Sequence, residues 1–288
     1  MKPAPFDYVR ATSVDDAVAA LVAGGGAAKV IAGGQSLVPM LNFRLIDAPT
    51  FVDINAIPDL ANIEETADGG LRIGALTRHY ALETSAAVET RFPVIRAAMR
   101  HVAHLAIRNR GTIGGSLSHA DPAAELPALA LLLDAVIRTA GPDGGREIAA
   151  RDFFVAPLTT ALAADEIVVA VDLPGLPAGC GWGFEEFARR HGDFAIAGAA
   201  AVIAVEEGRI VEARIALMGV HDTPVRAAAA ERLLTGAAPD AAGIEAAAAA
   251  IGADIEPMTD LHGSADYRRH LAAVLVRRAL ASALERAA

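Results

Sequence analysis

The chain has 288 residues, enough for about two domains at roughly 150 residues each and for sizeable hydrophobic cores. Its 25 basic and 35 acidic residues give a net charge of −10, which disfavours a general binder of nucleic acid or anionic membranes. The one cysteine, Cys180, excludes an internal disulfide and any multi-cysteine zinc or iron–sulfur site made by this chain alone. No apolar run approaches the length of about 18 residues that spans a membrane, and the first residues lack the apolar core of a signal peptide. We therefore expect a cytoplasmic protein with no membrane span.

The amino-terminal part of the chain predicts a small parallel α/β unit. Ser13 is a typical helix cap, and apolar residues follow it at helical spacing, so a helix is the first expected element. Short buried strands at 29–32 and 51–54 flank a short helix at 38–45. Strand, helix and strand this close together indicate parallel pairing, and we predict a first domain over residues 1–55.

The middle of the chain, residues 56–176, predicts a mainly antiparallel sheet with helices on one face. Asp68-Gly69-Gly70, between the segments 62–66 and 71–75, indicates a hairpin turn, and a second such turn is expected from Gly141. A β-branched strand over 166–173 ends at Pro174. The predicted helices of this domain are at 78–85 and 93–106.

A segment rich in proline and glycine, 174–179, introduces a third domain over residues 177–288. We predict a small antiparallel sheet backed by helices there. The expected strands are at 182–189, 197–205 and 209–219, and the expected helices are at 225–235, 240–251 and 265–286.

Two glycine-rich loops are the strongest candidate binding site. They are Ala32-Gly33-Gly34-Gln35-Ser36-Leu37 and Gly111-Thr112-Ile113-Gly114-Gly115-Ser116. Glycine has no Cβ, so successive backbone N–H groups can converge on an anion such as a phosphate, and the hydroxyl residues add donors. The alternative for either loop alone is a tight turn without a ligand. Neither loop matches the P-loop or the Rossmann fingerprint.

Longer segments around both loops resemble the FAD-binding motifs of a known family. The family is the FAD-binding medium subunit of molybdenum hydroxylases, of the carbon monoxide dehydrogenase and xanthine dehydrogenase type. The segments that carry the resemblance are 32–39, 107–116, 120–127, 165–168 and 192–195, and the likeness extends over essentially the whole chain. It implies an α+β fold of the FAD-binding PCMH type, followed by a carbon monoxide dehydrogenase flavoprotein C-terminal domain over residues 177–288.

The resemblance also implies which residues hold FAD. The cofactor would lie between the first two domains, with its pyrophosphate at Ala32 to Ser36 and Thr112 to Ser116. Glu125 stands where the family has an acidic residue that bonds the adenosine ribose. Val168 falls at an apolar position near the adenine, and Phe194 falls where the carbon monoxide dehydrogenase branch has a tyrosine near the isoalloxazine ring. No catalytic acid or base and no metal site are expected.

The implied function is electron transfer within a heteromeric molybdenum hydroxylase. In such enzymes a large subunit with the molybdenum cofactor oxidises the substrate, and a small subunit carries two [2Fe–2S] clusters. The medium subunit takes electrons from those clusters and passes them to an external acceptor, commonly within a dimer of heterotrimers. One cysteine suits the medium role, because a cluster needs several thiolates.

Two alternatives stay open at this point. One is a flavin-free protein of the same fold that acts in assembly or regulation, and the other is a flavoprotein that acts alone on a small molecule. The glycines and hydroxyl residues are present in both loops, which favours FAD binding.

Other residues have competing interpretations. His101 and His104 would share a helix face, where core packing or capping competes with a metal site. His79, His119 and Arg110 lie near the loops, where cofactor contact competes with ordinary structural roles. Finally, Gly114→Val is expected to abolish FAD retention by filling the space of the pyrophosphate.

Overall fold

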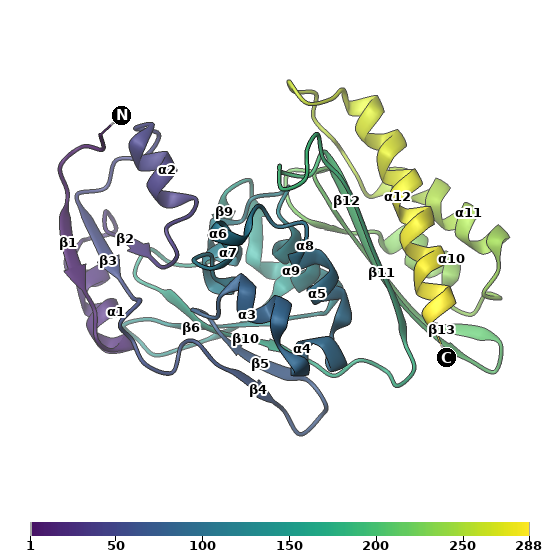
Figure 1. Ribbon diagram of the computed structural model, residues 1–288, viewed down its shortest axis with the longest axis horizontal. Helices are drawn as coiled ribbons and strands as arrows, with labels where there is room; N and C mark the ends of the chain where they lie inside the picture. Colours follow the sequence, from purple (N-terminus) through teal and green to yellow (C-terminus); the bar gives the residue numbers. More distant parts are fainter. Residues whose placement is uncertain (1, 288) are drawn as a thin grey trace.

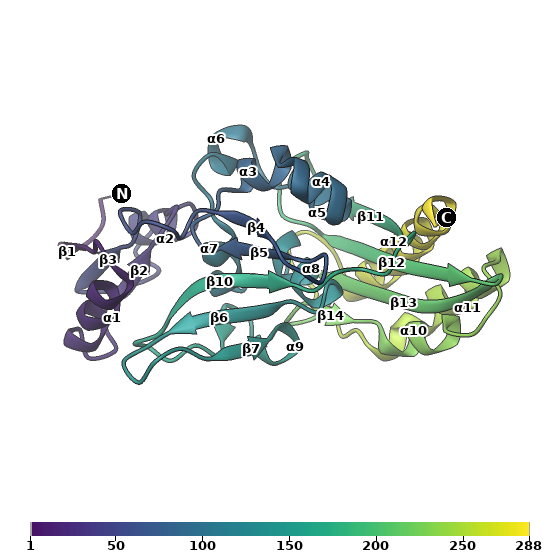
Figure 2. The same cartoon turned by 90° about the horizontal axis from the view of Figure 1, so that it is seen from below.

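The computed structural model describes residues 2–287, and its three larger sheets follow one another along the molecule (Figure 1). The amino-terminal unit lies at one end and the carboxy-terminal domain at the other, with the middle domain between them (Figure 2). Among these described residues, no helix is long and apolar enough to cross a membrane.

The amino-terminal unit is a three-stranded parallel sheet in the order β1-β3-β2. Ser13 caps the first helix, since its hydroxyl accepts from the backbone N–H of Asp16 at 3.0 Å. The predicted parallel unit is confirmed. Its elements are β1 (Asp7–Arg10), α1 (Val14–Ala23), β2 (Lys29–Ile31), α2 (Leu37–Asn42) and β3 (Thr50–Asp53).

The middle domain is a five-stranded sheet in the order β4-β5-β10-β6-β7, and every neighbouring pair is antiparallel. Figure 1 shows helices covering one face of this sheet, as predicted. The strands are β4 (Ile63–Glu65), β5 (Leu71–Gly74), β6 (Val136–Ala140), β7 (Glu147–Ala149) and β10 (Ile167–Leu173), and β8 (Phe154–Ala156) pairs with β9 (Thr159–Thr160) apart from them. The helices are α3 (His79–Thr84), α4 (Ala86–Arg91), α5 (Pro93–Met99), α6 (Leu105–Arg108), α7 (Ile113–His119), α8 (Glu125–Leu132) and α9 (Ala150–Phe153).

The carboxy-terminal domain is an antiparallel sheet in the order β11-β12-β13-β14, also as predicted. One face packs on α10, α11 and α12, and the other face joins the core of the middle domain. The strands are β11 (Gly181–Phe187), β12 (Ala197–Glu206), β13 (Arg209–Met218) and β14 (Val225–Arg226). The helices are α10 (Ala228–Leu234), α11 (Ala241–Ala250), a 3₁₀ turn (Ile251–Ala253) and α12 (Ala265–Arg286).

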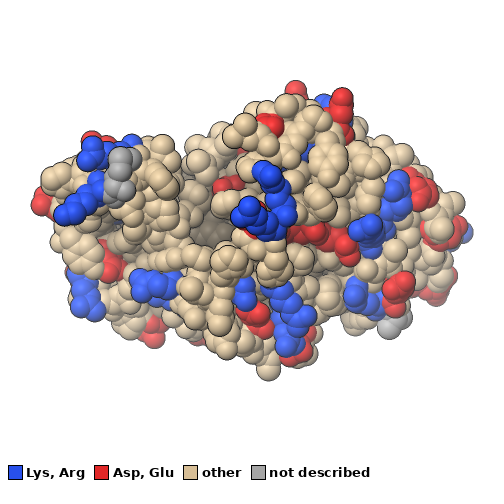
Figure 3. Space-filling model, turned by 45° about the horizontal axis from the view of Figure 1, so that its top comes forward, with Lys and Arg blue, Asp and Glu red and all other residues tan. Residues whose placement is uncertain are grey.

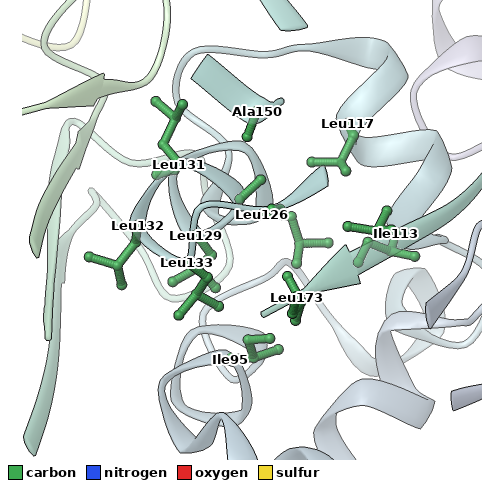
Figure 4. Packing of buried hydrophobic residues seen from close by; sticks show 14 of the residues in the cluster. Ile95, Ile113, Leu117, Leu126, Leu129, Leu131, Leu132, Leu133, Ala150 and Leu173 are labelled. Carbon is green, nitrogen blue, oxygen red and sulfur yellow. The ribbon is translucent and has the colours of Figure 1, made fainter. Parts of the chain in front are cut away.

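Helix α8 lies between the middle sheet and the carboxy-terminal sheet. Its leucines point to different sides, and each side meets other buried residues (Figure 4). A helix enclosed in this way needs apolar residues on every face, so it shows no amphipathic pattern.

Several predicted elements differ from the structure. The helix expected over 93–106 is two helices, because residues 100–104 leave the helical path and Ala103 has a φ of 41°. The helix expected over 225–235 begins only at Ala228, after the short strand β14. The first element is strand β1 rather than α1, and neither α7 nor α8 was expected.

Candidate cofactor site at two glycine loops

The first glycine loop presents a run of free backbone donors. It follows β2 and leads into α2, and Gly34 takes a φ of 72° that favours glycine. Among the described residues, none accepts a hydrogen bond from the backbone N–H groups of Gly33 through Leu37. The Gln35 side chain donates to the carbonyl oxygen of Gly33 at 2.8 Å, which folds the loop on itself. Five consecutive free donors at a helix start form a strong site for an anion.

The second glycine loop is largely the buried beginning of α7. Thr112 caps this helix, because its hydroxyl accepts from the N–H of Gly115 at 3.1 Å. The N–H groups of Ile113 and Gly114 donate to the carbonyl oxygens of Thr77 and Ala75. Gly115 and Ser116 are therefore the residues of this loop that stay half-exposed beside the first loop.

Gly114→Val was expected to abolish FAD retention because the new side chain would fill the space of the pyrophosphate, and this reason is wrong. A Cβ on Gly114 would lie 2.6 Å from the Cβ of Ala75 and 2.8 Å from its carbonyl oxygen, inside the middle domain. A valine there would disturb core packing instead of filling the space of a pyrophosphate.

The two loops touch each other and are tied together by two side chains. A Cβ on Gly33 would lie 2.9 Å from the Cα of Gly111. Asn55, just after β3, donates to the carbonyl oxygen of Ala32 at 2.7 Å. Arg78 donates to the Asn55 side chain at 2.7 Å and to the carbonyl oxygen of Arg110 at 2.5 Å. Sequence reasoning missed Asn55 and Arg78, because only the fold brings them between the loops.

His79 supports the second loop from beneath. Its side chain is 7% exposed, and Nε2 donates to the carbonyl oxygen of Thr112 at 3.1 Å. Burial lowers the pKa of His79 to about 4, so the ring is neutral at physiological pH. His79 therefore holds the loop in place and does not face a ligand.

Acid should weaken the fold at His79. The unfolded ring binds a proton near pH 6.5 and the folded ring only near pH 4, so stability is lost as the pH falls through this window. The loss at the low end is about 3 kcal/mol. We expect the stability advantage of the parent over His79→Leu to shrink between pH 7 and pH 5 in urea titrations. An advantage that does not change with pH would contradict this role.

Glu125, Val168 and Phe194, the other predicted contacts of the cofactor, lie on three different segments. Burial raises the pKa of Glu125, at the start of α8, to about 7. Val168 is buried in the core of the middle domain, and its contact with adenine stays a prediction. Phe194 is 65% exposed on the segment between β11 and β12, where it is free to cover a ligand. Near it, Gly192 packs against the carbonyl oxygen of Ala103, within the break between α5 and α6.

The remaining candidates have structural roles. His101 and His104 do not share a helix face, because both lie in the break between α5 and α6 and His104 precedes α6. No group of three or more metal-ligating side chains occurs within residues 2–287. Arg108 is bound to Glu83 and to the carbonyl oxygens of Val102 and Ala103. His119 is half-buried at the end of α7.

The surface is hollowed where the amino-terminal unit meets the rest of the molecule (Figure 3). Basic and acidic side chains both reach the rim of this hollow on the side of the middle domain. The free donors of Gly33 to Leu37 suit the pyrophosphate of a dinucleotide, and an exposed aromatic ring suits a flavin. The residues present therefore fit FAD, and the fold and the site define a protein that binds a nucleotide cofactor.

Comparisons with known proteins identify the family. Residues 4–176 match the FAD binding domain in molybdopterin dehydrogenase, and residues 182–283 match the CO dehydrogenase flavoprotein C-terminal domain. The chain therefore belongs to the FAD-binding subunits of molybdopterin-dependent dehydrogenases, and its cofactor is FAD.

Individual relatives agree over their full length. The chain is 46% identical to the 6-hydroxypseudooxynicotine dehydrogenase complex subunit alpha of Paenarthrobacter nicotinovorans, over 100% of this chain and 97% of the relative. It is 38% identical to the carbon monoxide dehydrogenase medium chain of Hydrogenophaga pseudoflava, over 100% of both. The solved carbon monoxide dehydrogenase of that organism superposes with a TM-score of 0.98 at 40% identity, over 100% of both chains. These relatives give no support to a flavin-free role in assembly or regulation.

Proposed function

We propose that this chain holds FAD between its two glycine loops and serves as the medium, electron-transferring subunit of a molybdenum hydroxylase. The observation that carries the proposal is the run of five free N–H groups from Gly33 to Leu37, tied to the second loop through Asn55 and Arg78. Bound FAD supplies the redox chemistry, and the protein supplies binding, orientation and electronic tuning.

The first loop is the main pyrophosphate cradle in this proposal. Its donors are already oriented by Gly34 and by the Gln35 side chain, so binding requires little rearrangement. Gly115 and Ser116 complete the cradle from the second loop, because they are the half-exposed part of that loop. Arg78 adds a positive charge between the loops, although burial lowers its pKa.

Phe194 and Glu125 would contact other parts of the cofactor. The exposed ring of Phe194 presents an apolar face that stacks on an isoalloxazine ring and shields it from water. Glu125 offers carboxyl oxygens to sugar hydroxyls. No acid or base is needed on this chain, because substrate oxidation takes place on another subunit in the proposed complex.

The proposed partners are a large molybdenum-cofactor subunit and a small [2Fe–2S] subunit, assembled as a dimer of heterotrimers in the cytoplasm. Relatives described as medium chains or as subunits of a complex support a multi-subunit assembly. The names of these relatives refer to chemically different substrates, a nicotine derivative and carbon monoxide. Such variety suits a subunit whose task does not depend on the substrate.

Purification of the tagged chain from its native host, followed by native mass spectrometry, tests the assembly. We expect two further subunits in equal amounts, with molybdenum and iron in the complex. A chain that purifies alone and oxidises a small molecule by itself would contradict the proposal and support a solitary flavoprotein.

A further inference from the structure

Glu186, on β11, has a buried carboxyl group with one oxygen, Oε2, that the fold leaves without a hydrogen-bond partner. Its side chain is 3% exposed, and no atom of the described residues is within hydrogen-bond distance of Oε2. A buried carboxylate normally has hydrogen-bond donors or a cation beside it, because burial without them is costly. An unpartnered oxygen of this kind indicates either a bound proton or a ligand group that is absent from the free chain.

Glu186 lies on the side of β11 that faces the middle domain. Phe184 and Trp182, two and four residues earlier on the same strand face, pack against the core of that domain. The opposite side of the strand faces α12, since Gly183 lies against Ala279 of that helix and Phe187 lies against Tyr267. Glu186 therefore points toward the start of α8 and the break between α5 and α6.

The groups that face Glu186 include a second carboxyl and a neutral imidazole. Glu125, at the start of α8, interacts electrostatically with Glu186, and Asp121 interacts in turn with Glu125. Nδ1 of His101 lies 3.9 Å from Oε2 of Glu186, and the His101 ring stacks on His191. Burial and His191 lower the pKa of His101, so this ring does not supply a compensating positive charge at neutral pH.

Two carboxyl groups that repel each other in a buried setting do not both ionise readily. Burial, followed by the charge of Glu125, raises the pKa of Glu186 to about 8. Burial raises the pKa of Glu125 to about 7. At neutral pH the pair therefore retains about one proton, in the manner of coupled carboxylates that titrate as a unit.

We propose that Glu186 and Glu125 form a carboxyl pair that shares a proton and hydrogen-bonds polar groups of the bound flavin nucleotide from the floor of its site. This inference rests on the proposed function. Glu125 begins α8 a few residues after α7, whose first turn is the second glycine loop. The segment with Gly192 and Phe194, directly after β11, packs against Ala103 and His104 on the way to that loop. The carboxyl pair thus lies between the two parts of the site that would contact the cofactor.

A shared proton gives the pair one donor and several acceptors, which suits a ligand that carries hydroxyls, an imide N–H and carbonyl oxygens. Loss of the proton places a second negative charge in the site and removes the donor. FAD, whose pyrophosphate is itself negative, should then bind more weakly. Binding is therefore linked to protonation, and affinity falls by at most about tenfold for each pH unit above the pKa of the pair.

The test compares the dissociation constant of FAD for the apoprotein between pH 6 and pH 9, measured by quenching of flavin fluorescence. The variants are Glu186→Gln, which keeps shape and polarity without the titration, and Glu185→Gln, which changes the neighbouring carboxylate on the same strand. We expect the parent and E185Q to lose at least about tenfold in affinity over this range. E186Q leaves only Glu125 to titrate, so its loss of affinity should begin near pH 7 instead of near pH 8, and the double variant Glu125→Gln/Glu186→Gln should keep an affinity that changes little with pH. Glu125→Gln, which removes the charge that helps to raise the pKa of Glu186, gives the corresponding test if E186Q does not fold.

An infrared difference spectrum on FAD binding provides a second readout. The carbonyl stretch of a protonated carboxylic acid should be present in the parent and E185Q, weaker in E186Q and absent in Glu125→Gln/Glu186→Gln. A parent that binds FAD with a pH profile equal to that of E186Q, without this band, would overturn the carboxyl pair and leave the FAD site intact. A folded parent that binds no FAD at any pH would instead overturn the proposed function.

Discussion

Gly33→Ala should abolish the retention of FAD while the carboxy-terminal domain stays folded. The new Cβ would lie 2.9 Å from the Cα of Gly111 and still closer to the carbonyl oxygen of Arg110. Both neighbours are backbone atoms, so relief requires the two loops to separate. Separation also breaks the connection through Asn55 and Arg78 and disperses the free donors of the first loop. We expect the dissociation constant of FAD to rise by roughly 100-fold or more, equivalent to about 3 kcal/mol.

Gly252→Ala is the matched control for this variant. A Cβ on Gly252 meets no atom within 4 Å, and the residue lies in the 3₁₀ turn of the carboxy-terminal domain. FAD titrations of both variants, with circular dichroism to verify folding, separate a local effect from unfolding. Gly33→Ala that binds FAD as tightly as Gly252→Ala would show that contact between the loops is not needed for the site.

Arg268→Ala should cause a large loss of stability in the carboxy-terminal domain. Arg268, in the first turn of α12, is 6% exposed and donates to the carbonyl oxygens of Ile196 at 2.5 Å and Gly219 at 2.8 Å. It also forms an ion pair with Asp260 at 2.6 Å. Removal of the guanidinium leaves buried acceptors without donors, which costs about 3 kcal/mol. We expect the melting temperature to fall by roughly 5–10 °C.

The loss of stability in Arg268→Ala should also reach the segments that carry Phe194 and Glu125. Ile196 follows Phe194 by two residues, and the N–H of Gly219 donates to the carbonyl oxygen of Pro122 at 2.8 Å. Arg268 therefore fixes both the segment that carries Phe194 and the segment that leads to Glu125. Hydrogen exchange should become faster at residues 193–197 in Arg268→Ala.

Arg269→Ala is the control, because Arg269 forms only an exposed ion pair with Asp266. A surface pair of this kind contributes about 0.5 kcal/mol, so this variant should melt close to the parent. Equal melting temperatures for Arg268→Ala and Arg269→Ala would contradict the role assigned to the buried guanidinium.

The sequence correctly predicted the elements that depend on interactions between neighbouring residues. The cap at Ser13, the turns at Asp68-Gly69-Gly70 and after Gly141, and the strands of the carboxy-terminal sheet all depend on neighbouring residues, and all are present. Helix α8 was missed because it is apolar on every side, so nothing in its sequence distinguishes it from a buried strand. Strand β1 was missed because it is an exposed edge strand without alternation.

The interruption between α5 and α6 depends on contacts that lie outside local sequence. Arg108 donates to the carbonyl oxygens of Val102 and Ala103, which are thereby satisfied outside a helix. Gly192, distant in sequence, packs against the same segment. Helical spacing carries no information about either interaction, so the predicted helix extended through residues 100–104.

The two loops of the candidate site could be predicted from the sequence, but the contacts that arrange them could not. Glycine pairs beside hydroxyl residues identified both loops as candidates. The family resemblance supplied Glu125 and Phe194 as further candidate residues of the site. Sequence could not show that the second loop turns most of its donors inward, since this follows from pairing with Ala75 and Thr77. It also could not show Asn55 and Arg78 between the loops, or Glu186 beside Glu125, because each pairing joins distant segments.

An absorbance spectrum of the purified chain, after incubation with excess FAD and desalting, tests the central claim most directly. Bound flavin absorbs at about 375 and 450 nm. We predict these bands at close to one FAD per chain. If partners complete the site, the bands are present in the chain purified with its partner subunits instead of in the chain alone. A folded chain that retains no flavin in either form would contradict the claim that these two loops hold FAD.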